Sequence, residues 1–181
     1  MKRCFIVAGG EKSGTRLATR ILIAAGCLGI ATADARPEFG GWPQFYDLND
    51  PQGETPIVIR RTLPYHPGRQ WVELEPLIDR IKALGYDITI IFTVRSSDCT
   101  AKSLVVSRYV ANFEEGLKDT TRANSEIQAY IARSEADSYV LPYECLVDDS
   151  KKELKTMSEA IGLDCTVFSE PIFDGNAQYK Q

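Results

Sequence analysis

Histidine and long apolar runs are scarce in this sequence, and its cysteines follow no metal-binding pattern. There is one histidine among 181 residues, and no two cysteines have CxxC spacing, so the sequence argues against a structural metal. No stretch reaches the roughly 18–20 apolar residues that cross a bilayer, so we expect no membrane insertion. The cysteines are Cys4, Cys27, Cys99, Cys145 and Cys165. Their odd number and wide scatter predict reduced thiols and a cytoplasmic location.

Basic residues are fewer than acidic ones, which gives a net charge of −4. This balance argues against a sequence-independent grip on nucleic acid, so we expect no nucleic-acid partner. A small anionic ligand still fits, because local arginines and helix N-termini bind anions against an unfavourable overall charge. Hydrophobic residues make up 44% of the chain and charged residues 25%, as in ordinary globular proteins, and the length suits one domain over residues 1–181.

Short apolar runs alternate along the chain with segments of helical spacing. The runs at 4–8, 56–63, 87–94 and 138–142 predict strands, and 87–94 is the most β-branched of them. Helices are predicted over 14–25, 73–84, 98–112, 120–133 and 150–161. Strands that alternate with helices form a parallel sheet covered on both faces. We therefore predict a three-layer α/β/α fold with a central parallel sheet of 4–5 strands, and a ligand site at the carboxyl ends of the strands.

The first predicted strand runs into a glycine-rich segment, 9–16, that opens a helix. Glycines let successive N–H groups turn inward, and the helix N-terminus adds partial positive charge, so the segment is suited to bind phosphate or sulfate. Lys12 offers a point charge, and Ser13 and Thr15 offer hydroxyl donors. The spacing from Gly9 to Gly14 is that of a P-loop, which makes the predicted fold P-loop NTPase-like.

The residues after this loop depart from the nucleoside-triphosphatase pattern. Thr15 and Arg16 stand where that motif has lysine followed by serine or threonine. A P-loop kinase that phosphorylates small substrates with Mg-ATP therefore fits less well, although it stays open as an alternative. A glycine turn that holds no ligand is the other alternative.

Three motifs, in order along the chain, resemble the sulfotransferase family, whose members use 3′-phosphoadenosine 5′-phosphosulfate as sulfuryl donor. The segment 12–15, Lys-Ser-Gly-Thr after a strand, resembles the family's 5′-phosphosulfate loop. Arg95 ends the strongest predicted strand and Ser103 follows eight positions later, as in the family's 3′-phosphate site, although Ser-Ser-Asp replaces the usual Asp-Pro-Arg. The stretch 143–149, followed by a helix that ends in Gly162, resembles the family's Tyr-Glu-Asp-Leu segment.

The resemblance implies an enzyme that transfers a sulfuryl group to a hydroxyl or amine of a small-molecule or glycan acceptor, with no metal. It implies that the donor is held by Lys12, Ser13, Gly14, Thr15, Arg16, Arg95 and Ser103. Negative charge develops on the leaving phosphate oxygen during such a transfer, so preorganised cations are the main catalytic lever. Lys12 is the predicted catalytic cation, with Arg16, Arg60 or Arg61 in support.

The general base is the main departure from the family. Aligning Leu63-Pro64 with the family's second strand places Thr62 where cytosolic members have a catalytic histidine, and threonine is no general base near neutral pH. His66, four residues later, and Glu11, in the loop, are the candidates, with Glu73 a weaker one. A non-catalytic nucleotide-binding relative that lacks the base is the third hypothesis.

The parts of the site beyond the loop are less defined. The family's C-terminal Arg-Lys-Gly stretch is absent, and the tail 176–180 either covers the site or frays. Acceptor pockets in such folds come from variable loops, here the predicted loops 29–55 and 112–121. Aromatic residues in loops around the site either line it or pack the loops themselves, namely Trp42, Phe45, Tyr46, Tyr65 and Trp71. The sequence specifies neither the acceptor nor the oligomeric state.

Overall fold

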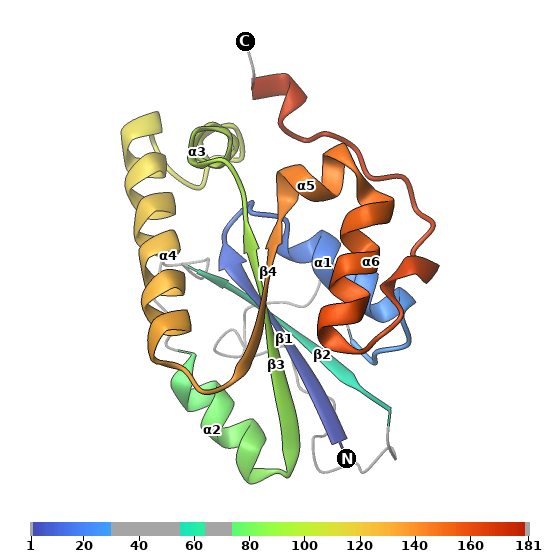
Figure 1. Ribbon diagram of the computed structural model, residues 1–181. Helices are drawn as coiled ribbons and strands as arrows, with labels where there is room; N and C mark the ends of the chain where they lie inside the picture. Colours follow the sequence, from blue (N-terminus) through green and yellow to red (C-terminus); the bar gives the residue numbers. More distant parts are fainter. Residues whose placement is uncertain (1, 30–54, 64–73, 180–181) are drawn as a thin grey trace.

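The computed structural model describes residues 2–29, 55–63 and 74–179, and Figure 1 shows their arrangement. The elements follow in the order β1 (Lys2–Gly10), α1 (Thr15–Ala24), β2 (Ile57–Leu63), α2 (Glu75–Ala83), β3 (Tyr86–Val94), α3 (Ser97–Val106), α4 (Phe113–Arg133), β4 (Asp137–Pro142), α5 (Tyr143–Asp148), α6 (Ser150–Ile161), η2 (Cys165–Val167) and η3 (Ala177–Tyr179). Among the described helices, none combines the length and the apolar character that a membrane span requires.

The four described strands form one parallel sheet in the order β2-β1-β3-β4. β1 lies inside the sheet, with Cys4 paired to Ile57 of β2 and Lys2 paired to Tyr86 of β3. Because all strands run the same way, their carboxyl ends meet at one edge, where the loops after β1 and β3 lie side by side. The predicted α/β class, the parallel sheet and the number of strands are confirmed.

Helices cover both faces of the sheet, which gives the three predicted layers (Figure 1). Apolar side chains of α2 and α4 pack on one face of the strands and those of α1 and α6 on the other. Alternate residues of β1 serve the two cores: Ile6 faces the first and Phe5 the second, and both are fully buried. A strand buried on both faces has a continuous apolar sequence, which is why segment 4–8 could be predicted as a strand.

The connection between α3 and α4 differs from the prediction. A helix was expected over 98–112, a loop over 112–121 and a second helix from 120, but α3 ends at Val106 and α4 already begins at Phe113. Asn112 caps α4 by accepting a hydrogen bond from the backbone N–H of Glu115, and Glu115 accepts one from the N–H of Ala111. The predicted loop 112–121 is therefore wrong for all but its first residue.

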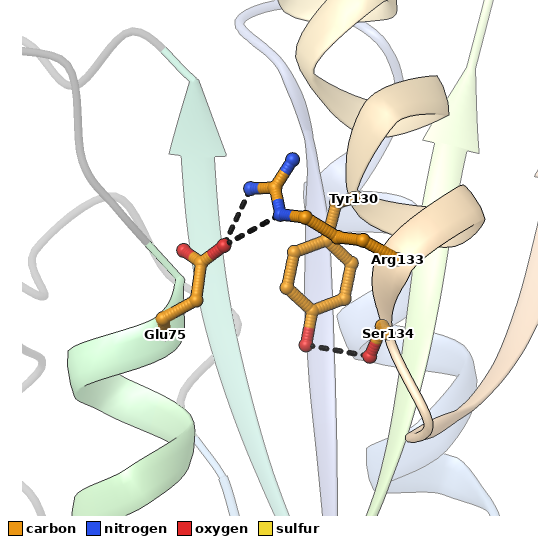
Figure 2. Close-up of polar contacts among 4 residues, drawn as sticks. All are labelled: Glu75, Tyr130, Arg133 and Ser134. Carbon is orange, nitrogen blue, oxygen red and sulfur yellow. Dashed lines mark hydrogen bonds and ion pairs between the residues drawn. The ribbon is translucent and has the colours of Figure 1, made fainter.

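Polar contacts join α2 to α4 at the end of the sheet opposite the glycine-rich loop 9–16 (Figure 1 and Figure 2). Arg133 of α4 donates two hydrogen bonds to the carboxylate of Glu75 at the start of α2, and its guanidinium lies 5.5 Å from the ring centre of Tyr130. The Ser134 hydroxyl donates to the Tyr130 hydroxyl at 3.0 Å. The hydrogen bond from Arg133 holds the pKa of Glu75 below its ordinary value.

Candidate functional site

The glycine-rich loop 9–16, called the loop below, joins the carboxyl end of β1 to the first turn of α1. The N–H of Ser13 donates to the carbonyl of Gly10 at 3.1 Å, which closes a tight turn. Lys12 has φ 66° and Gly14 has φ 103°, so two positions of the loop adopt the left-handed conformation. A non-glycine residue in that region is strained, and such strain clusters at ligand-binding loops. The loop therefore has the backbone geometry of an anion cradle at a helix N-terminus.

Gly9 is required by the crowding at the end of β1. A Cβ atom built on Gly9 would lie 2.2 Å from the hydroxyl oxygen of Thr93, 2.6 Å from that of Ser13 and 2.7 Å from the carbonyl oxygen of Thr93. The two hydroxyls are 2.7 Å apart and hydrogen-bonded, and both residues are buried. The Ser13 hydroxyl thus anchors the loop to β3.

Arg95, directly after β3, is held by the loop and by the C-terminal segment. Its Nη1 donates to the carbonyl of Lys12 at 2.8 Å, its Nη2 to the carbonyl of Gly175 at 2.8 Å, and its Nε to the side-chain oxygen of Asn176 at 2.6 Å. The guanidinium also lies 4.7 Å from the ring centre of Tyr143. Arg95 therefore links the first and second motifs of the sequence and touches the third.

Tyr143 and Glu144 open α5 and connect the third motif to the same place. The Tyr143 ring is the nearest neighbour of Gly14, at 3.0 Å from a built Cβ atom, so glycine is favoured there by space as well as by φ. Glu144 accepts hydrogen bonds from the N–H of Ser96 at 2.9 Å and from the side-chain amide of Asn176 at 2.7 Å. The three motifs, distant in sequence, meet at the carboxyl edge of the sheet.

Charged and aromatic side chains gather on the outer side of the loop. The Lys12 ammonium lies 4.9 Å from the ring centre of Tyr109, in the connection between α3 and α4. Burial lowers the pKa of Arg60, and the nearby charge of Arg16 lowers it further. Burial likewise raises the pKa of Tyr109, with Glu11 adding to the rise while Arg16 and Arg60 oppose it. The charges of Arg16, Arg60 and Glu11 are therefore close enough to interact with one another at the loop.

The predicted site residues are brought together in part. Arg16 is exposed on the first turn of α1, and Thr15 is buried beneath it. Ser103 is buried in α3, but none of the hydrogen bonds described for Arg95 goes to it. Arg61 is buried on the face of β2 opposite Arg60.

Several candidates of the sequence analysis lie outside the described residues. These are His66 and Glu73, the aromatic residues Trp42, Phe45, Tyr46, Tyr65 and Trp71, and nearly all of the predicted loop 29–55. Glu11 is thus the one candidate base that the described part of the chain places at the loop.

Neither a metal cluster nor a reactive thiol stands out near the loop. Within residues 2–29, 55–63 and 74–179, no three His, Cys, Asp or Glu side chains converge in a way that would hold a metal ion. All five cysteines are free, and Cys145 alone among them is exposed. Burial raises the pKa of Cys27 to about 12 and that of Cys165 to about 11, so both are thiols at neutral pH.

Comparison with known proteins gives a similarity in structure. The sequence matches no protein-family model and no curated protein. Among solved structures, the crystal structure of mouse sulfotransferase SULT7A1 complexed with PAP is similar over 98% of this chain, with a TM-score of 0.50 and 15% sequence identity. The chain spans 62% of that protein, less than two thirds of its length. This likeness shows the fold: the protein has a sulfotransferase-like, P-loop NTPase-like α/β fold.

Tyr109 and Thr93 were not among the predicted site residues, whereas Asn176 belongs to the tail that was expected either to cover the site or to fray, and it contacts Arg95. Tyr109 follows Arg108, which has φ 59°, and no glycine or asparagine marks this left-handed position in the sequence. Thr93 reads as an ordinary β-branched strand residue. The Gly175-Asn176 pair is a turn signal, but its contact with Arg95 spans 81 residues of sequence and has no local pattern.

Proposed function

We propose that this protein is a sulfotransferase that moves a sulfuryl group from 3′-phosphoadenosine 5′-phosphosulfate to a hydroxyl or amine of a small-molecule or glycan acceptor. The observation that carries the proposal is the meeting of three motifs: Arg95 bonds to the carbonyl of Lys12 and stacks on Tyr143, which packs on Gly14. The similarity in fold to a sulfotransferase that was crystallised with PAP supports it.

The residues present fit a phosphosulfate group. The loop has left-handed backbone at Lys12 and Gly14 and leads directly into the first turn of α1, so the amides at the α1 N-terminus are available to an anion. When bound, the donor supplies the activated sulfuryl group. In this proposal the loop amides and the α1 N-terminus bind the 5′ end, and Arg95 is the cation for the 3′-phosphate.

Lys12 is the proposed catalytic cation. Its ammonium already lies beside the loop, held over the Tyr109 ring by a cation–π contact that is weak enough to be exchanged for an anion. Arg60 and Arg16 reinforce the positive potential there, and developing negative charge is stabilised by such preorganised cations. For the general base we propose Glu11 or His66, to be separated by testing Glu11→Gln and His66→Ala for turnover.

The test is calorimetric titration with PAP, the donor product, with and without magnesium. We expect metal-independent binding that Lys12→Met weakens by about tenfold, the effect of one charge-assisted hydrogen bond. Lys151→Met, an exposed lysine on α6, is the matched control and keeps the wild-type affinity. Binding of ATP only with magnesium would replace the proposal with a P-loop kinase, and PAP binding without turnover of any acceptor would favour the non-catalytic relative.

A further inference from the structure

The C-terminal segment 173–179 contacts the edge of the Arg95 guanidinium at which the proposed function places the 3′-phosphate. Gly175 and Asn176 accept two of the three hydrogen bonds of Arg95. The ring of Tyr179, in the same segment, has its centre 6.0 Å from the guanidinium, and Tyr143 covers it from 4.7 Å. Neutral oxygens thus stand where an anion would bind.

This segment is fastened by more than its contacts with Arg95. Tyr143 donates its hydroxyl to the carbonyl of Phe173 at 2.9 Å and accepts the N–H of Gly175 at 2.8 Å. Lys102 of α3 donates to the carbonyl of Tyr179 at 2.7 Å. Asn176, which is 2% exposed, is gripped between Arg95 and Glu144. The segment is therefore a built part of the site.

The charge of the groups that bond to Arg95 determines how strongly a phosphate competes with them. The hydrogen bonds described for Arg95 go to an amide oxygen and two backbone carbonyls, none of which carries a formal charge. A phosphate forms shorter, stronger bonds to a guanidinium than neutral oxygens do, and these bonds are often bidentate. To form them, however, it must first displace the oxygens of Asn176 and Gly175, which offsets most of the gain.

We propose that Asn176 is a specificity-determining residue that competes with the 3′-phosphate for Arg95. The inference rests on the proposed function. A nucleotide with a 5′-phosphate alone binds the loop with the segment in place, whereas a 3′-phosphate is accommodated by releasing residues 173–179 from Arg95. In wild type the 3′-phosphate consequently adds little affinity.

The experiment compares PAP with adenosine 5′-phosphate by calorimetry on wild type, Asn176→Ala and the control Ala177→Ser. Ala177 is the exposed neighbour of Asn176, and its side chain is outside the contacts of Arg95. We expect wild type to bind the two nucleotides within about threefold of each other. Asn176→Ala binds PAP about tenfold tighter, the effect of removing one competing bond to a charged group, while its affinity for adenosine 5′-phosphate is unchanged.

Amide hydrogen exchange of wild type supplies a second readout that needs no variant to fold. PAP is expected to speed exchange in residues 173–179 and adenosine 5′-phosphate to leave it unchanged. Slower exchange there with PAP, or equal or weaker PAP binding by Asn176→Ala, overturns the inference and leaves the proposed function standing. Absence of binding by either nucleotide to any of the three proteins overturns the proposed function and the inference together.

Discussion

Replacing Gly9 by alanine tests the packing at the end of β1 without reference to any ligand. The added Cβ would lie 2.2 Å from the Thr93 hydroxyl oxygen, which can rotate away, but also 2.7 Å from the Thr93 carbonyl, which belongs to a neighbouring strand. Overpacking of this kind costs about 1–3 kcal/mol. Losing the hydrogen bond between Ser13 and Thr93 adds about 1 kcal/mol. We expect Gly9→Ala to lower the free energy of unfolding by about 2–4 kcal/mol.

The assay is equilibrium unfolding in urea followed by circular dichroism. For an m-value of about 2 kcal/mol/M, the midpoint falls by about 1–2 M. Gly26→Ala is the comparison: Gly26 has φ 98° and nothing within 4 Å of its built Cβ, so alanine there carries a left-handed backbone cost of about 1–2 kcal/mol, which Gly9 in β1 does not have, and no crowding. A loss at Gly9 no larger than that at Gly26 would refute the reasoning.

The same crowding predicts a coupling between Gly9 and Thr93. In a Thr93→Ala background the hydroxyl contact and the bond to Ser13 are already gone, so Gly9→Ala then costs less than in wild type. Equal costs in the two backgrounds would place the strain on the contacts that remain, the Ser13 hydroxyl and the Thr93 carbonyl.

Three further predictions concern parts of the chain away from the loop. Arg133→Ala lowers stability at neutral pH, and the loss fades as the pH falls below 4.5. The reason is that the hydrogen bond from Arg133 lowers the pKa of Glu75, and protonation of Glu75 removes that contribution. Urea unfolding at pH 7 and pH 3 checks this prediction, and an equal loss at both pH values contradicts it. Asn112→Ala removes the cap of α4 and costs about 1 kcal/mol in the same assay, whereas no loss would mean that α4 begins elsewhere. A thiol reagent modifies Cys145 rapidly in the native protein and Cys27 only after unfolding, which mass spectrometry of peptides resolves.

The fold could be predicted from the sequence where local patterns are strong. The apolar run 87–94 could hardly be anything but a buried strand, and Gly162, with φ 63°, ends α6 at the predicted residue. The start of α4 was missed although its signal is present: Asn112 followed by Glu115 is a capping pair, and Gly116 interrupts the helical pattern in the first turns. Gly116 is there because Ala101 of α3 lies 3.0–3.3 Å from its built Cβ, a tertiary cause that no local pattern carries.

The candidate site, too, was predictable only where its residues lie close together in the sequence. The loop 9–16 was predictable because its three glycines and its lysine lie within six residues of each other directly after a strand, and its phosphate-binding role stays a prediction. The partners of Arg95 were not predictable, because Asn176 and Gly175 reach it from the far end of the chain. A contact between segments that are distant in the sequence produces no repeating pattern in either segment.

The central place of β1 in the sheet has a consequence for how the protein folds. Its partners are β2 and β3, so Cys4 must find Ile57 and Lys2 must find Tyr86 before the strand is paired on both sides. Such non-local pairings raise the contact order, so the parallel sheet forms more slowly than the local contacts of the helices. The turn after Gly10 gains its fixed shape only when this central strand is enclosed. In the proposed function, affinity for the donor therefore develops only once the sheet is complete, after the helices have formed.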